Sequence, residues 1–205
     1  NIIRSPKSYN SQVGVPLSVI SINDKHNLGI FEAGISKMNE MEKLETIIRP
    51  TIGIITNIGT AHDEGFEDLE KKIKEKLKLF KHSKLIIYQK NKIVDALIES
   101  KLKAFSWSYT DETADVFVEK INGKSKLKQA LRAFKNIDSF DEKESIFIIL
   151  DADASFTDTE RSIIATLREL QISTPTAHNE IAMNGNTKIS FFIMPGKDKP
   201  GAIED

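Results

Sequence analysis

The strongest constraint on the fold of this chain is a series of short apolar runs separated by turn-forming residues. The runs are rich in Ile, Val and Phe, and Gly, Pro, Asn or Asp bound them, which is typical of buried strands. They occupy residues 17–22, 28–34, 51–59, 84–90, 114–121, 146–153 and 189–195. Helical patterns lie between several of the runs, so the sequence predicts an α/β fold in which helices flank a mostly parallel sheet.

One of the helical patterns carries a long run of lysines. Over residues 67–80, apolar side chains recur at helical spacing, namely Leu69, Ile73, Leu77 and Phe80. This stripe is expected to face the core. The lysines that fill the other face of the helix are expected to be solvated.

The charge balance and the composition of the chain exclude several classes of function. The 29 Lys and Arg residues nearly balance the 30 Asp and Glu residues, so no global field attracts nucleic acid or an anionic membrane. The chain has no cysteine, which excludes disulfides, a thiol nucleophile and Cys-ligated zinc. Because it has neither a signal peptide nor an apolar run of about 18 residues, we expect a cytoplasmic protein that makes no membrane contact.

The ends of the sequence and one interior segment indicate partial domains. The chain begins without Met and stops without a helix-stop signal, so we expect a fragment. A strand pattern is interrupted within residues 119–126, where a basic helix begins. We therefore predict two partial domains, at 1–120 and 121–205.

Two polar residues follow neighbouring strands of the predicted sheet. Glu32 closes the run at 28–34 and His62 follows the run at 51–59, so both are expected at the carboxyl edge, where open α/β sheets bind ligands. A carboxylate and an imidazole at this edge could hold Mg²⁺ or Mn²⁺ and neutralise phosphate charge. The alternative is that both are ordinary surface residues.

The segments around these residues resemble a known family. The stretches RSPKSYNSQVGVPLSV, FEAGISKMNEMEKLETIIRPTIGIITNIGTAHDEGF and KEKLKLF are similar to the central ATPase domain of the Mur ligases, over about residues 1–118, and in particular to the members that add D-Ala-D-Ala. The resemblance implies that ATP and Mg²⁺ activate the carboxylate of a UDP-muramoyl-tripeptide as an acyl phosphate. The amine of D-Ala-D-Ala then attacks the acyl phosphate to form an amide in peptidoglycan synthesis.

Carried over position by position, the resemblance implies a role for each motif residue. Glu32 and His62 would ligate the divalent cation near the γ-phosphate of ATP, and Asn57 would lie beside the nucleotide. Lys76 falls where the family has a lysine whose carbamate helps to bind a second magnesium, although the Gly-Glu that follows it in the family is replaced here. Lys76 and His62 are therefore the predicted catalytic residues. The segment near the muramoyl substrate corresponds to Tyr9, Asn10 and Ser11.

Two parts of the family pattern do not occur in these 205 residues. One is the Gly-rich phosphate-binding loop that ends in Gly-Lys-Thr or Gly-Lys-Ser. The other is the carboxy-terminal domain, which brings the adenine and amine site. We therefore expect a ligase fragment that does not turn over ATP by itself.

A second acidic strand end lies far downstream, at Asp151 and Asp153. Alternate residues of an extended chain face the same side, so these two carboxylates are predicted to project together and hold Mg²⁺, the alternative being a capping or surface role. The stretches GKSKLKQALRAF, IFIILDADASFTDTERSIIATLREL and ISFFIMPGKDKPGAIED resemble the latter part of a Toprim-like domain, over about 122–205. The alternative functions are thus a Mg²⁺-dependent nuclease or nucleotidyl-transfer module that contacts nucleic acid, or a non-catalytic chimeric α/β protein.

Overall fold

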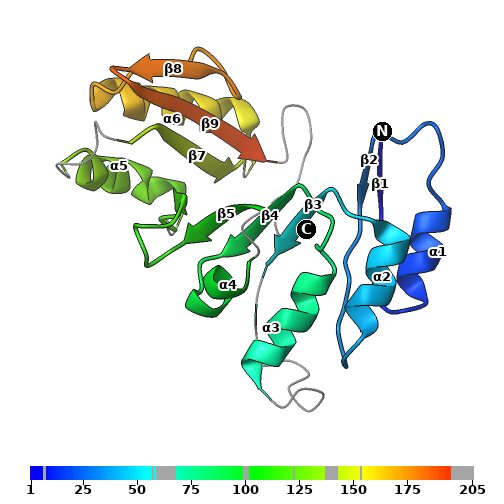
Figure 1. Cartoon of the computed structure of the whole chain (residues 1–205). Helices are drawn as coiled ribbons and strands as arrows, with labels where there is room; N and C mark the ends of the chain where they lie inside the picture. The colour runs from blue at the N-terminus through cyan, green and yellow to red at the C-terminus, as the bar shows by residue number, and fades with distance from the viewer. Residues whose placement is uncertain are drawn as a thin grey trace. The chain divides into compact units, whose positions relative to one another are not determined.

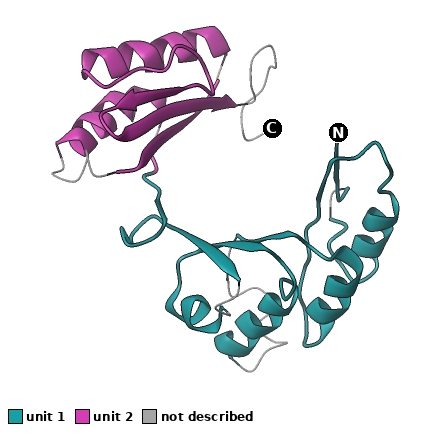
Figure 2. Ribbon diagram, turned by 45° about the horizontal axis from the view of Figure 1, so that its top comes forward, with its two compact units in different colours: residues 1–119 teal, residues 120–205 magenta. Residues whose placement is uncertain are grey.

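The computed structural model describes residues 1–6, 8–56, 58, 68–98, 102–121, 123–136, 143–152 and 154–194. The chain divides into two compact units, residues 1–119 and 120–205 (Figure 2). The division falls inside the segment 119–126, where the strand pattern of the sequence is interrupted.

Unit 1 contains two parallel sheets (Figure 1). In the first, β1 (Ile2–Arg4) pairs with β2 (Leu28–Ile30). The second has the order β3-β4-β5-β6, and all of its neighbouring strands are parallel. Its strands are β3 (Ile52–Ile55), β4 (Leu85–Gln89), β5 (Lys103–Ser108) and β6 (Val116–Phe117). The predicted α/β fold with parallel sheets and flanking helices is confirmed.

The helices of unit 1 are α1 (Gly14–Ile20), α2 (Glu40–Ile48), α3 (Leu69–Lys78) and α4 (Lys92–Leu97). Helix α1 corrects a prediction, because residues 17–22 were expected to form a strand. Its buried residues are Gly14, Val15 and Ser18, a spacing that places them on one side of a helix. The prediction was wrong because a short apolar run does not by itself distinguish a strand from a buried helix.

The larger sheet of unit 1 is covered on one face by α2, α3 and α4. Ile55, Ile86 and Tyr88 point into this core and are buried. Neighbouring positions face the other way, and there Ile54 is 59% exposed and Phe105 is 40% exposed. The second face of the sheet is therefore apolar and open to solvent.

Unit 2 is built on a three-stranded sheet with the order β7-β9-β8. Its elements are η2 (Lys124–Lys126), α5 (Leu127–Lys135), β7 (Ser145–Asp151), α6 (Phe156–Glu169), β8 (Ile181–Asn184) and β9 (Thr187–Met194). Strands β7 and β9 are parallel, whereas β8 and β9 form an antiparallel hairpin. Gly185, at the hairpin turn, has φ of 61°, a value that suits glycine.

The core of unit 2 also lies on one face of its sheet. Side chains of α5 and α6 pack there against Ile148, Phe191 and Ile193. On the opposite face, Phe147 is 55% exposed and Met183 is 54% exposed. Both units thus combine one helix-covered face with one open apolar face.

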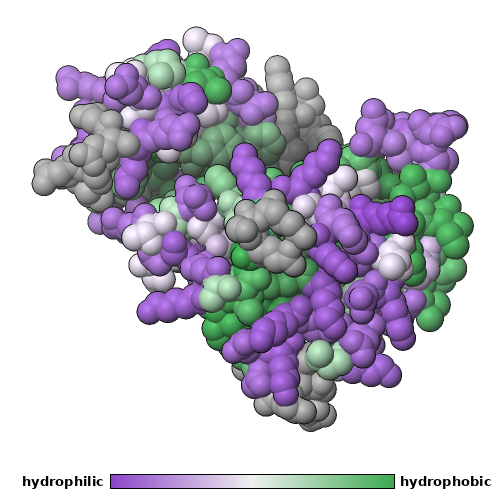
Figure 3. All heavy atoms as spheres, in the orientation of Figure 1, coloured by the Kyte–Doolittle hydropathy of each residue, from purple (hydrophilic) through white to green (hydrophobic). Residues whose placement is uncertain are grey.

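The surface of unit 1 also carries hydrophobic side chains over α1. Leu17 is 53% exposed and Ile20 is 79% exposed, and Figure 3 shows hydrophobic surface at this end of the unit. Within the described ranges, no helix is both long enough and apolar enough to cross a membrane.

Candidate functional site

Glu32 lies in the loop that connects β2 to α2, two residues beyond the end of β2. Its Oε1 atom accepts a hydrogen bond from Asn10 Nδ2 at 3.0 Å. The backbone N–H of Gly34 donates to the carbonyl oxygen of Asn10 at 2.7 Å. The structure therefore brings a residue of the predicted substrate segment into contact with the predicted metal ligand.

The segment that carries Tyr9, Asn10 and Ser11 is held in place by the start of α1. Ser11 Oγ accepts a hydrogen bond from the N–H of Gly14 at 3.1 Å. A Cβ atom added to Gly14 would lie only 2.8 Å from the Cα atom of Tyr9, so this position requires glycine. Tyr9, which is 47% exposed, and Ser11 are both exposed, whereas Asn10 is half-buried.

A cavity of about 360 Å³ lies next to this contact. Its walls come from the segment before α1 and from the loop after Glu32, and the lining residues are Asn10, Ser11, Gln12, Val13, Gly34, Ile35, Ser36 and Glu40. A cavity of this size is in the range that small-molecule sites occupy. The predicted substrate residues Asn10 and Ser11 therefore line a cavity, and Asn10 connects it to Glu32.

Glu40 fixes the loop that follows Glu32. One of its carboxylate oxygens accepts hydrogen bonds from the N–H groups of Ser36, at 2.7 Å, and Lys37, at 3.0 Å. Burial would raise the pKa of the Glu40 carboxyl, but the hydrogen bonds from Ser36 and Lys37 outweigh burial and lower the pKa. Glu40 therefore stays ionised and ties the loop to the first turn of α2.

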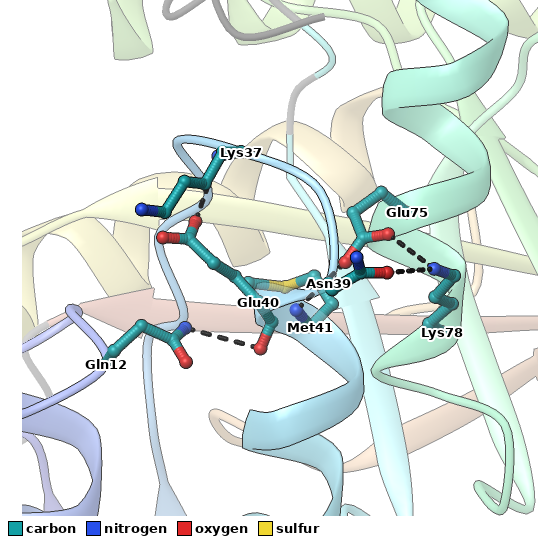
Figure 4. A network of polar contacts seen from close by, with 7 residues as sticks. All are labelled: Gln12, Lys37, Asn39, Glu40, Met41, Glu75 and Lys78. Carbon is teal, nitrogen blue, oxygen red and sulfur yellow. Dashed lines mark hydrogen bonds and ion pairs between the residues drawn. The ribbon is translucent and has the colours of Figure 1, made fainter.

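Glu75 anchors α3 to the start of α2, as Figure 4 shows. Its side chain is fully buried; Oε1 accepts the N–H of Met41 at 3.1 Å, and Oε2 lies 2.7 Å from Lys78 Nζ. Lys78 Nζ also lies 3.4 Å from Asn39 Oδ1. Sequence reasoning missed Glu75, and the available signal was an isolated acidic residue three positions before a lysine in a basic helix.

Lys76 occupies a half-buried position on α3. Burial lowers the pKa of its amine, and the neighbouring positive charge of Lys72 lowers it further. Lys72 is only 2% exposed, so the prediction of a solvated lysine face is wrong at this position. Leu69, which was expected in the core, is 43% exposed, because α3 turns Lys72, Ile73 and Glu75 inward instead.

The donor groups at Glu32 suit a hard divalent cation. Mg²⁺ and Mn²⁺ accept carboxylate and amide oxygens, and both types of oxygen are available at the Glu32–Asn10 pair. No group of three or more His, Asp or Glu side chains placed to hold a metal occurs among the residues that the structure describes. His62 and Asn57 lie outside those residues. Joint metal binding by Glu32 and His62 therefore stays a prediction.

In unit 2, Asp151 is the last residue of β7, as the sequence suggested. The following residue, Ala152, continues the pairing by donating its N–H to the carbonyl oxygen of Met194 at 2.6 Å. Ser155 then caps α6, because its Oγ accepts the N–H of Asp158. Asp153 lies outside the described residues, so the convergence of the two carboxylates is untested.

Other polar side chains near this strand end hold secondary structure together. His178 Nδ1 accepts the N–H of Ile193 at 3.0 Å, and the N–H of His178 donates to Glu160 Oε1 at 2.8 Å. The His178 ring also lies against Phe192, with ring centroids 4.6 Å apart. These contacts join α6, the following loop and β9.

Comparison with known proteins identifies the family. The family model of the Mur ligase middle domain matches residues 1–149, so the chain belongs to the Mur ligase family. The match extends past residue 118, where we expected the likeness to end. No finding supports a Toprim-like domain or a nucleic-acid partner, and both stay predictions.

Individual relatives point to one branch of the family. The UDP-N-acetylmuramoyl-tripeptide–D-alanyl-D-alanine ligase of Borreliella burgdorferi is 40% identical over 70 residues, which cover 34% of this chain and 15% of that protein. The enzyme of the same name from Treponema pallidum is 39% identical over 61 residues, covering 30% of this chain and 13% of that protein. This chain thus spans only a small part of the length of either relative.

A solved structure shows the same fold. A crystal structure of MurF from Acinetobacter baumannii superimposes with a TM-score of 0.51 and 22% sequence identity, covering 59% of this chain and 27% of that chain. At this level of identity the likeness establishes the fold alone.

Proposed function

We propose that this chain provides part of the ATP-dependent domain of a MurF-like ligase, which joins D-Ala-D-Ala to UDP-muramoyl-tripeptide. The observation that carries the proposal is the hydrogen bond between Asn10 and Glu32, beside a cavity of about 360 Å³. It connects a substrate-side residue to a metal-side carboxylate. The names of the relatives supply the substrates of the proposed reaction.

Each residue has a defined task in this proposal. Glu32 and His62 would hold Mg²⁺, which would neutralise charge on the phosphates of ATP. Asn57 would lie beside the nucleotide, as the family resemblance implies. Asn10 both lines the cavity, in which the muramoyl end of the substrate would sit, and donates a hydrogen bond to the Glu32 carboxylate.

Lys76 contributes through the chemistry of its amine. A lowered pKa increases the neutral fraction of the amine, and only the neutral amine reacts with CO₂ to form a carbamate. The resulting carbamate oxygens would help to bind a second magnesium.

Hydrogen exchange with Mn²⁺ and ATP tests the metal-binding part of the proposal. We expect slower exchange at residues 8–12 and 32–36 when both are added, and loss of this protection in Glu32→Gln. Asp151→Asn is the matched control in unit 2 and should keep the protection. Unchanged exchange at both segments in the parent chain would contradict the proposal.

A ligase assay addresses turnover separately. The 205 residues contain no Gly-rich loop of the pattern Gly-x-x-x-x-Gly-Lys-Thr/Ser, because the one Gly-Lys-Ser, at residues 123–125, has Val118 where the first glycine would stand. We therefore expect no amide product from UDP-muramoyl-tripeptide, D-Ala-D-Ala and ATP with this chain alone. Product formation would show that this loop is dispensable.

A further inference from the structure

Strand β7 of unit 2 is apolar on both of its sides. The inward residues Ile148 and Leu150 are buried in the core. Phe147 and Ile149, which alternate with them and point the other way, are each more than half exposed. A sheet that faces water on one side shows alternating apolar and polar residues, whereas strands buried on both faces carry continuous apolar runs. Strand β7 has the second pattern, which is typical of a strand that is covered on both faces.

The strand register shows which side chains share the open face of this sheet. Phe147 of β7 pairs with Ser190 of β9, and Ser190 pairs with Ile181 of β8. In the next row on the same face, Ile149 pairs with Phe192. Rows on one face lie two residues apart, which is about 7 Å along the strands. The open face therefore carries a largely apolar band that crosses all three strands (Figure 1).

The two ends of this band carry opposite charges. Lys188 of β9 lies one row before Ser190, and Asp151 of β7 lies one row after Ile149, so alternation places both on the open face. The two positions are three rows apart, which is about 20 Å along the strands. Within one copy, Lys188 Nζ also lies 3.7 Å from Glu144 Oε1, in an exposed pair at the start of the sheet.

This distribution of charge makes the face complementary to itself. Consider a second copy whose open face is stacked on the first, related by a two-fold axis that crosses the strands midway along the band. Each Lys188 then lies in the same row as Asp151 of the other copy, one strand to the side. The two Lys188 side chains lie at opposite ends of the stack, so like charges do not meet. A two-fold interface requires such self-complementarity.

We propose that the open face of the unit 2 sheet is a dimer interface, covered by the same face of a second copy of this chain. Stacked sheets lie about 10 Å apart with their side chains interdigitated, so Phe147, Ile149 and Ile181 lose their contact with water. The band measures about 15 Å by 20 Å, which is small beside the roughly 800 Å² that each partner buries in a standard interface. We therefore expect a dissociation constant in the micromolar range. The interface does not depend on the proposed ligase function.

Sedimentation equilibrium of the full chain tests the dimer. We expect the molar mass to rise with concentration from 23.0 kDa to about twice that value and to stop there, because a two-fold contact closes on itself. A mass that stays at that of one chain across the micromolar and millimolar range would overturn the proposal. A mass that continues to rise beyond the dimer would also overturn it.

Removal of the apolar centre should weaken the dimer most. The double variant Phe147→Thr with Ile149→Thr keeps residues that suit a strand but removes most of the apolar surface. Because both side chains are exposed in one copy, we expect an unchanged circular dichroism spectrum and a dissociation constant at least about tenfold higher. Ile20→Thr is the matched control, since Ile20 is 79% exposed on α1 of unit 1. An unchanged constant in the double variant, or an equal weakening in Ile20→Thr, would contradict the proposed interface.

Charge reversal tests the orientation of the two copies. Lys188→Glu brings two carboxylates into one row, and Asp151→Lys brings two ammonium groups into it. Each single variant should therefore weaken the dimer about tenfold, because the dimer contains the row twice. The variant with both reversals exchanges the two charges and should recover the affinity of the parent chain. If it binds no better than the single variants, the proposed two-fold arrangement is wrong.

A single introduced cysteine identifies what covers the face, because the chain contains no other cysteine. Ser190→Cys lies within the band, and a short bismaleimide should join it to a second copy and double the mass on a denaturing gel. Ser162→Cys, at an exposed position of α6, is the matched control and should stay at the mass of one chain. If Ser190→Cys gives no cross-linked dimer, or no more than Ser162→Cys, something other than a second copy covers the face and the proposal is overturned.

Discussion

Unit 1 and unit 2 each carry a carboxylate at the end of a strand in a parallel pair, Glu32 after β2 and Asp151 at the end of β7. In unit 1, a second segment reaches this position, because Asn10 donates to Glu32 beside a cavity. In unit 2, Glu160 and His178 hold α6, a loop and β9 together. In unit 1 the hydrogen bond from a distant segment, beside a cavity, is what makes the strand-end carboxylate a candidate site.

In both units, the two faces of the sheet differ in how well their apolar side chains are buried. Helices cover one face, while the other exposes side chains such as Ile54 in unit 1 and Phe147 in unit 2. Burial of apolar side chains supplies most of the stabilisation of a domain, so the covered face of each sheet should dominate its stability. The covered face should therefore contribute more stability than the open face, and each unit should unfold without changing the stability of the other.

The largest effect is expected in the core of unit 2. Phe191→Ala should lower the free energy of unfolding by about 3–5 kcal/mol, because Phe191 is fully buried, whereas Phe147→Ala on the open face should cost well under about 2 kcal/mol. Urea unfolding followed by circular dichroism measures the loss. Trp107, the only tryptophan, reports on unit 1 by fluorescence and should give an unchanged transition. A matching shift in fluorescence would show that the units unfold together.

In unit 1, the anchor between α3 and α2 should give the next largest effect. Glu75→Ala leaves the N–H of Met41 without its partner and should cost about 1–3 kcal/mol. Glu70→Ala removes only an exposed ion pair on the same helix and should cost less than about 1 kcal/mol. The Trp107 fluorescence transition measures both variants. Equal losses would mean that the buried contact does not stabilise unit 1.

Helix caps should contribute similarly in the two units. Asp68 accepts the N–H of Lys71 at 2.7 Å at the start of α3, and Ser155 accepts the N–H of Asp158 at 3.2 Å at the start of α6. Replacing either cap by alanine should cost about 1 kcal/mol. Trp107 fluorescence should detect only the loss in Asp68→Ala, whereas circular dichroism should detect the loss in both variants. A fluorescence change in Ser155→Ala would contradict the separation of the units.

The smallest effect is a pH dependence confined to unit 1. Hydrogen bonds from the N–H and hydroxyl of Ser106 hold the pKa of Asp115 below its usual value. A lowered folded-state pKa contributes stability above the unfolded value of about 3.9, and this stability is lost as pH falls through the folded-state pKa. Asp115→Asn should therefore flatten the acid side of the stability profile measured by Trp107 fluorescence. If Asp115→Asn and the parent chain lose the same stability at low pH, Asp115 does not make this contribution.

The sequence by itself determined the fold class and the family of this protein. Strands such as β4 and β9 are short and apolar with clear turn residues at their ends, and this local pattern identifies them without knowledge of the rest of the chain. The motif around Glu32 could likewise be identified from consecutive residues. These features depend on neighbours in the sequence, so one sequence was sufficient to predict them.

Only the tertiary structure decided which side of each element is buried and which residues meet. It made residues 17–20 part of α1, turned Lys72 into the interior, and placed Glu75 against the N–H of Met41, 34 positions away. The contact of Asn10 with Glu32 likewise joins residues 22 positions apart. Local patterns report the tendency of a segment to be buried, whereas the partner of a buried polar group is set by how distant segments pack.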